Sequence, residues 1–131
     1  MNREEGTVSV VVATVVALMA VVAIGLAAVG MVMAAAGRAQ NAADAAALAA
    51  APLTFRSFGA TNGAFAEAAR YADLNGATLV ECDGCEVDRS WRSRTVEIEV
   101  AVNLDFPAFG SLGVTALAAA EFVPAQLLGA P

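Results

Sequence analysis

The sequence predicts an α+β protein, in which a long N-terminal transmembrane helix precedes a small extracytoplasmic head. The head is expected to hold one short helix and an antiparallel sheet of about three strands. Three observations predict this arrangement. No charged residue lies between Glu5 and Arg38, an alanine-rich stretch then continues without a helix breaker as far as Pro52, and residues 95–102 alternate between two faces.

The apolar run covers residues 6–37 and would form a helix roughly 48 Å long at about 1.5 Å per residue. A bilayer core of about 30 Å needs only about 20 apolar residues. Valine tracts favour strands in water, but in lipid the backbone must pair within its own segment, which favours a helix. The run therefore predicts a membrane-spanning helix.

A cleaved secretory signal is the alternative interpretation of this run. Its apolar region should cover only about 7–15 residues after a basic start, with small residues at the cleavage site. Residues 34–36 are three alanines, which fits such a site, but the run is too long and Arg3 is followed by two glutamates. The sequence therefore favours a retained helix.

Residues 38–51 extend the predicted helix beyond the apolar run, because alanine is the best helix former and no breaker intervenes before Pro52. Gln40 and Asp44 lie four residues apart and can support each other. Four alanines share one smooth face, which we expect to pack closely against other helices: Ala39, Ala43, Ala46 and Ala50.

A short polar leader ending in Gly6, the uncharged helix, and the stretch RAQNAADAAALAAA together resemble the TadE/TadG-like pseudopilins. The chain is most similar to the actinobacterial TadE-like branch of the tight-adherence (Flp) pilus system. The resemblance lies in residues 6–51 and continues weakly beyond them. Its motif residues in this chain are Arg38, Ala39, Gln40, Ala42, Ala43, Asp44, Ala47, Leu48, Ala49 and Ala50.

The resemblance implies a pilin-like helix, a head outside the cytoplasm, and cleavage by a prepilin peptidase between Gly6 and Thr7. It implies a role in assembling a Flp/Tad-type pilus or a related secretion filament, with other pilin or pseudopilin subunits and the Tad machinery as partners. Many prepilins carry Glu at the fifth mature position, where this chain has Val11. That departure favours a minor subunit over the main pilin.

Two features of the sequence predict opposite orientations of the helix in the cell membrane. Arg3 precedes the helix while Arg38 and Arg56 follow it, which weakly favours a cytoplasmic C-terminal part. The closely spaced pair Cys82 and Cys85 favours an oxidising, extracytoplasmic compartment. The family resemblance agrees with the cysteines.

A short helix is expected over residues 63–74, where Phe65, Ala68, Ala69 and Ala72 recur at helical spacing. Asn62 is its expected N-cap, and Asn75-Gly76 its expected end. The resulting division of the chain is a leader at 1–6, a transmembrane and extended helix at 7–51, a linker at 52–62, the head at 63–123 and a tail at 124–131.

The Cys82-Asp83-Gly84-Cys85 turn admits three chemistries. A turn of four residues brings its end Cα atoms within about 7 Å, which suits a disulfide. A thioredoxin-like pair would open a helix beside a βαβ unit, and none is predicted here. A zinc site needs about four ligands, but the chain has two cysteines and no histidine. The sequence favours a structural disulfide.

The rest of the head is predicted to hold strands at 77–81, 95–102 and 114–123, with a loop at 103–113. Val96, Ile98, Val100 and Val102 should form its buried face. Glu97 and Glu99 share the other face; we interpret them as solvated side chains rather than a catalytic pair. Trp91, among arginines, is interpreted as a packing residue rather than a nucleic-acid contact.

The composition excludes several functions. The net charge is −6 and there is no lysine, so clustered basic residues for a nucleic-acid partner are missing. No histidine is available for general base catalysis, and no phosphate-binding glycine loop is present. The sequence therefore predicts a non-enzymatic protein without catalytic residues, cofactor or metal.

Two functions of other classes remain open. One is a single-pass, membrane-anchored exported domain that binds an envelope ligand outside any filament. The other is a membrane-anchored thiol oxidoreductase, which would require Cys82 or Cys85 to be reactive.

Overall fold

The computed structural model describes residues 3–56, 62–106 and 110–129, with side chains from residue 8 onward. It divides into two compact units, residues 1–33 and 34–131, and each is described by itself. The elements follow the order α1 (Arg3–Ala50), the 3₁₀ helix η1 (Ala51–Thr54), α2 (Ala64–Leu74), β1 (Thr78–Asp83), β2 (Arg94–Phe106), β3 (Gly110–Phe122) and the 3₁₀ helix η2 (Pro124–Leu128). This confirms the predicted α+β class and the order of its elements.

The first unit consists of helix alone. Helix α1 begins at Arg3, so Gly6 and Thr7 lie within its helical backbone. From Val8 to Met33 nearly every side chain is exposed, including the large ones such as Leu26 and Met33. No hydrophobic face is separated from a polar one along this stretch, which is typical of a segment whose surroundings are apolar on all sides.

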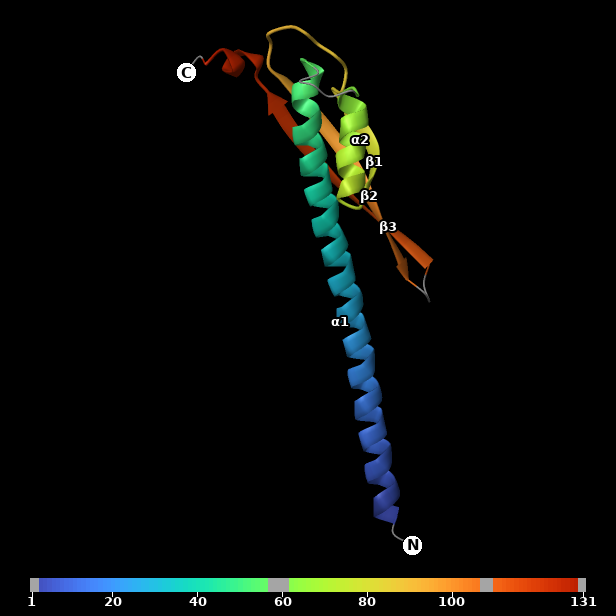
Figure 1. The fold of residues 1–131 in the computed structure, drawn as a ribbon. Helices are drawn as coiled ribbons and strands as arrows, with labels where there is room; N and C mark the ends of the chain where they lie inside the picture. Colours follow the sequence, from blue (N-terminus) through green and yellow to red (C-terminus); the bar gives the residue numbers. More distant parts are fainter. Residues whose placement is uncertain (1–2, 57–61, 107–109, 130–131) are drawn as a thin grey trace. The chain divides into compact units, whose positions relative to one another are not determined.

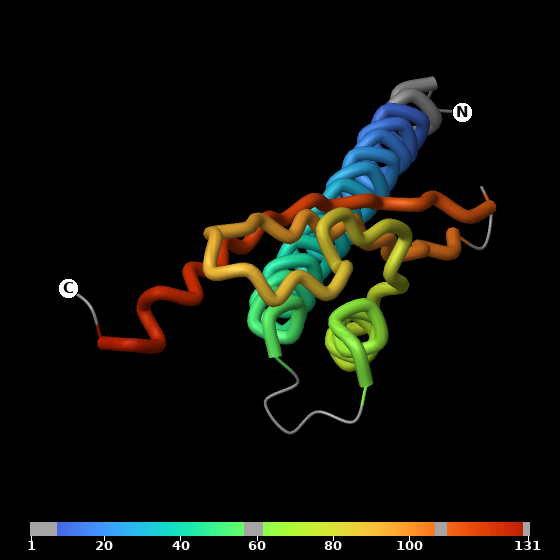
Figure 2. The backbone as a smooth tube through the Cα atoms, turned by 90° about the horizontal axis from the view of Figure 1, so that it is seen from above, coloured from blue at the N-terminus to red at the C-terminus, as the bar shows by residue number. Residues whose placement is uncertain are grey.

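The second unit is a sheet with helices on one face. The strands lie in the order β1-β2-β3, and both pairs are antiparallel. Figures 1 and 2 show the C-terminal part of α1 and helix α2 on the same side of this sheet. The register places residues of β2 and β3 opposite each other without interruption from Arg94↔Phe122 to Phe106↔Gly110.

The core of this unit confirms the predicted buried face of β2. Val96, Ile98 and Val100 are fully buried and Val102 nearly so. They belong to one buried cluster with the alanines of α1 and α2. Small alanines let the helix backbones approach the sheet closely, while the branched side chains of β2 supply the apolar area, worth about 1.5–3 kcal/mol for each fully buried valine or isoleucine.

The prediction that the alanine face of α1 packs against other helices was wrong. Ala39, Ala43, Ala46 and Ala50 have no solvent exposure, because they are covered within the head's own core. The predicted Gln40–Asp44 pair is confirmed: the Gln40 amide donates to the Asp44 carboxylate at 3.0 Å, and also to the Leu117 carbonyl of β3 at 3.3 Å. Close packing on another helix therefore cannot use this face while the head is folded.

Helix α2 differs from the prediction in its cap and its buried face. Gly63, not Asn62, is the N-cap, and no side chain caps it. The buried residues are Ala64, Ala68 and Ala72, whereas Phe65 is 59% exposed. The predicted end is confirmed, since Asn75 is the C-cap and Gly76 follows with φ of 75°. The alanines face the core because only small side chains fit there.

Strands β2 and β3 are longer than predicted. The expected loop at 103–113 was wrong in its described parts, because residues 103–106 and 110–113 continue the antiparallel ladder. Glycines at 110 and 113 suggested a loop, yet Gly113 pairs with Asn103 inside the ladder. The chain after β3 also has structure: Pro124 is buried and starts η2.

Candidate functional site

The apolar segment of α1 is the first candidate site. Over its most apolar window the mean hydropathy is 2.9 and no residue is buried. By length and composition this helix can cross a membrane, which fits a single-pass membrane protein. Gly6 and Thr7 immediately precede the described apolar side chains. Whether the chain is cleaved between them stays a prediction.

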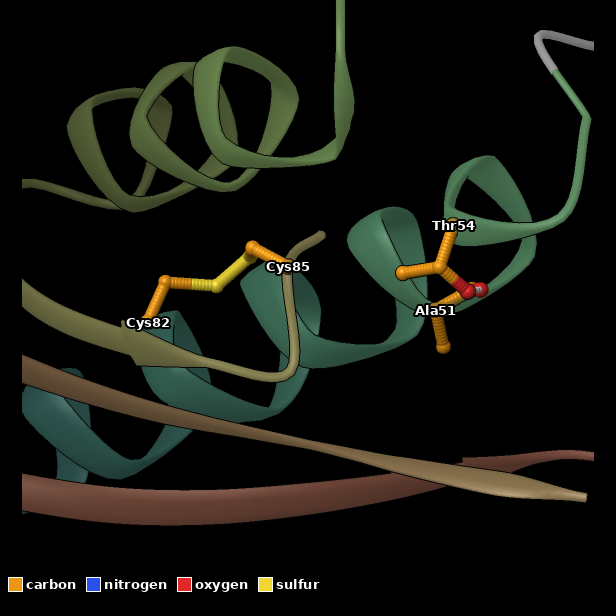
Figure 3. Close-up of a disulfide and its surroundings, with 4 residues drawn as sticks. All are labelled: Ala51, Thr54, Cys82 and Cys85. Atoms are coloured by element: carbon orange, nitrogen blue, oxygen red, sulfur yellow. Dashed lines mark hydrogen bonds between the residues drawn. A yellow bond between two sulfur atoms is a disulfide. The ribbon is translucent and has the colours of Figure 1, made fainter. Parts of the chain in front are cut away.

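The turn after β1 is the second candidate. Cys82 and Cys85 are joined by a disulfide, with their Cα atoms 5.8 Å apart, and Figure 3 shows this bridge closing the end of β1. Both cysteines pack against the buried cluster. Gly84 has φ of 73°, and a Cβ there would lie 2.5 Å from the Thr95 carbonyl oxygen. The turn therefore needs glycine both for its backbone and for its contact with β2.

A polar cluster that the sequence did not predict joins η1 to the connection before β2. Thr54 is fully buried, and its hydroxyl donates to the Ala51 carbonyl at 2.7 Å, as Figure 3 shows. The Thr54 carbonyl accepts the backbone N–H of Asp88 at 2.8 Å and the Arg94 guanidinium at 3.4 Å. These bonds fix the start of β2 against the end of the long helix.

Arg94 is the centre of that cluster. Its guanidinium also donates to the carbonyls of Asp88, Ser90 and Arg92, and its charged end lies 3.8 Å from the Asp88 carboxylate. The sequence alone predicts a charged connection over residues 86–94 and assigns Arg94 no role in it. The signal for the missed role was an arginine at the first position of a strand, where five donors can satisfy the carbonyls of a loop that has no ladder.

Two carboxylates in the head have lowered pKa values. The pKa of Asp88 lies below its ordinary range because the backbone N–H and the hydroxyl of Ser90 donate to it, with Arg94 and Arg92 adding a smaller effect. Glu67 shows the same direction, because Arg70 donates to its carboxylate at 2.5 and 3.1 Å, and this pair holds the pKa of Arg70 above its ordinary value. Both pairs lie at the surface and order it locally, although the Glu67 side chain is half-buried.

An open groove with a volume of about 530 Å³ lies beside η1 and η2, lined by Phe55, Arg56, Arg89, Trp91, Leu127 and Leu128. Phe55 is buried and forms an edge-to-face contact with Trp91 at 5.1 Å. The predicted packing role of Trp91 is thus met on one side of its ring, but 55% of the residue remains exposed. The sequence predicts that Phe55 and Phe58 both pack; Phe55 is buried, and Phe58 lies outside the described residues.

The outer face of the sheet is acidic. Glu81 lies opposite Glu99, and Asp83 lies opposite Glu97. The four carboxylates and Leu117 line a shallow hollow of about 140 Å³. Glu97 is exposed, as predicted for a solvated strand face, whereas Glu99 is half-buried. In the described parts of the chain, no group of three or more histidines, cysteines or acidic residues is placed to hold a metal ion.

A long apolar helix joined to a small disulfide-containing α+β head fits the class of single-pass membrane proteins. Within this class, residues 6–52 match the family model described as "Putative Flp pilus-assembly TadE/G-like". This confirms the resemblance on the segment that carried it in the sequence. The chain thus has a TadE/G-like Flp pilus-assembly segment, and the match supports involvement in Flp pilus assembly in general.

No curated protein and no solved structure matched the chain. The matched family is one of pilus assembly rather than one of enzymes. The match ends at residue 52, where α1 has just given way to η1. The head beyond that residue must therefore be interpreted from its own geometry.

Proposed function

We propose that the chain is a minor pseudopilin that takes part in assembling a Flp/Tad-type pilus or a related secretion filament. The observation that carries the proposal is the apolar stretch of α1, whose most apolar window has no buried residue and lies inside the segment matched by the family model, shortly after Gly6. A prepilin peptidase cuts after Gly6, and the mature chain begins at Thr7. The helix holds the subunit in the cell membrane, with the head outside the cytoplasm, until assembly.

The head supports this role in two ways. Its core takes up the alanine face of α1, so packing on other subunits' helices uses the upstream apolar stretch of residues 8–33 rather than this face. The oxidised pair Cys82–Cys85 is compatible with an extracytoplasmic compartment, where disulfides persist. A subunit of this design contributes one helix to a shared bundle and one folded surface to its neighbours.

The test replaces Gly6 with a bulky residue and follows the size of the membrane-bound product. The processed chain should start at Thr7 by N-terminal sequencing, and the Gly6→Leu variant should stay unprocessed at Met1. A matched control is Gly37→Leu, because no atom lies within 4 Å of the position of its Cβ and it lies far from the cleavage point in the sequence. An intact Met1 in the natural chain would contradict cleavage after Gly6. Equal sizes for the natural chain and the Gly6→Leu variant would contradict it as well.

A second candidate is an exported binding domain anchored by the uncut helix. The groove with its exposed Trp91 favours it, because a concave surface with an aromatic side chain and two arginines suits a ligand. This candidate predicts retention of Met1 and no recovery of the chain with sheared filaments, whereas the first predicts the reverse on both measurements.

A further inference from the structure

The groove beside η1 has the composition of a protein-binding surface. It combines the exposed Trp91 with two arginines, Arg56 and Arg89, and with Leu127 and Leu128, which are 50% and 72% exposed. Neither of these arginines makes an ion pair within the described residues. Trp and Arg are the residue types most enriched where binding energy concentrates in interfaces.

The outer face of the sheet has the complementary composition. Two pairs of like charges lie directly opposite each other across β1 and β2, Glu81 with Glu99 and Asp83 with Glu97. Such pairs destabilise a sheet. None of the four carboxylates makes an ion pair among the described residues. Beside them Leu117 is 67% exposed, so this face also combines charge with one large apolar side chain.

We propose that the groove of one copy docks on the acidic sheet face of a second copy of this chain. Arg56 and Arg89 then lie against the carboxylates of the neighbour, and Trp91 covers its Leu117. The two surfaces are built from different elements: η1, η2 and the connection before β2 in one case, and the three strands in the other. A contact between two different surfaces is heterologous, so it leaves one surface free at each end and can be repeated along an open chain.

This inference deepens the proposed function and rests on it, because it names the head contact between successive subunits. A net charge of −6 makes copies of the chain repel each other overall. The contact should therefore depend on local complementarity and weaken strongly with salt, since the screening length falls from about 10 Å at 0.1 M to about 3 Å at 1 M.

The experiment uses the full chain in detergent micelles and measures self-association by sedimentation. One variant neutralises the groove, Arg56→Gln with Arg89→Gln, and the other neutralises the face, Glu97→Gln with Glu99→Gln. Each variant alone should associate about tenfold more weakly than the natural chain. At a concentration where neither variant associates by itself, an equal mixture should form 1:1 pairs and nothing longer, because it contains one intact groove and one intact face.

Asp73→Asn on α2 is the control for a change of charge, since Asp73 is exposed and belongs to neither surface, and it should associate as the natural chain does. Unchanged association of either double variant, or no recovery in the mixture, overturns the inference. The inference is also overturned if the chain binds vesicles of phosphatidylglycerol and the arginine double variant loses this binding while its self-association is unaffected. Cleavage after Gly6 is scored separately, so a failed contact and a failed pseudopilin assignment give different results.

Discussion

Among the glycines that the structure describes, Gly84 should tolerate an added methyl group least. Its φ of 73° lies in the left-handed region, and the Cβ of an alanine would lie 2.5 Å from the Thr95 carbonyl oxygen. The neighbouring atoms are backbone atoms of β2, which cannot rotate away as a side chain can. Gly84→Ala must therefore shift the turn after β1 away from β2.

The structure offers a matched control at Gly76. Its φ of 75° is nearly the same, but no atom lies within 4 Å of the position of its Cβ. Gly76→Ala should lower the free energy of unfolding only through the strain of a left-handed alanine. The net loss should be about 1 kcal/mol, because alanine also lowers the entropy of the unfolded chain. Gly84→Ala adds the displacement of packed backbone, which brings its cost to about 2–4 kcal/mol.

The assay is denaturant unfolding of the full chain in detergent micelles, followed by the fluorescence of Trp91, the only tryptophan in the sequence. Trp91 lies in the connection that leads into β2, so its signal reports on the region that the turn contacts. The disulfide should also become easier to reduce in Gly84→Ala, because the turn that holds its two cysteines together is displaced. If the unfolding free energies of Gly84→Ala and Gly76→Ala lie within about 0.5 kcal/mol of each other, the close contact between Gly84 and the Thr95 carbonyl is refuted.

Three further predictions concern the head. Replacing Cys82 and Cys85 with serine should lower the unfolding free energy by about 2 kcal/mol, the small entropic gain expected for so short a loop, and the variant should stay folded by circular dichroism; global unfolding would contradict this. Ala46→Leu should destabilise by about 1–3 kcal/mol, because Ala46 is fully buried, whereas Ala36→Leu on the exposed side of the same helix should be nearly neutral in the same denaturation assay. Because the folded-state pKa of Asp88 is lowered, its carboxylate stabilises the folded state above the ordinary aspartate pKa of 3.8, and this stabilisation is lost as the pH falls through the lower folded value. Asp88→Asn should therefore flatten the curve of unfolding free energy against pH in that acidic range. An unchanged curve would contradict this role of Asp88.

The sequence predicted those parts of the fold that a local pattern determines. Alternation identified the buried face of β2, with Val96 and Ile98 at its centre, and Asp83-Gly84 identified the turn that the disulfide closes. The chain's alanine stretch predicted a helix with a smooth face. It could not predict what covers that face, because alanine allows close approach to a helix and to a sheet equally well.

The missed features depend on contacts between residues far apart in the chain. Arg94 satisfies carbonyls from residue 54 to residue 92. Its place at the start of a strand is the local signal for this role, but that signal does not indicate which carbonyls the guanidinium reaches. Glycines at 110 and 113 are typical of loops, but the ladder with β2 outweighs their low strand propensity. Of the candidate site, the disulfide pair was predicted, whereas the groove was not, since it combines η1, η2 and the connection before β2.

The burial of the alanine face changes how such a subunit can join others. Helix α1 is one continuous helix, yet its residues from Ala35 to Ala50 present their alanine face to the chain's own sheet. In the proposed pseudopilin, helix packing with other subunits therefore uses other surfaces than this face, above all residues 8–33, where valine, leucine and methionine side chains are exposed. Packing between apolar helices inside lipid has little hydrophobic driving force of its own. In the proposed pseudopilin, order among subunits then depends on the folded head, whose basic, aromatic groove and acidic sheet face differ and can set a direction.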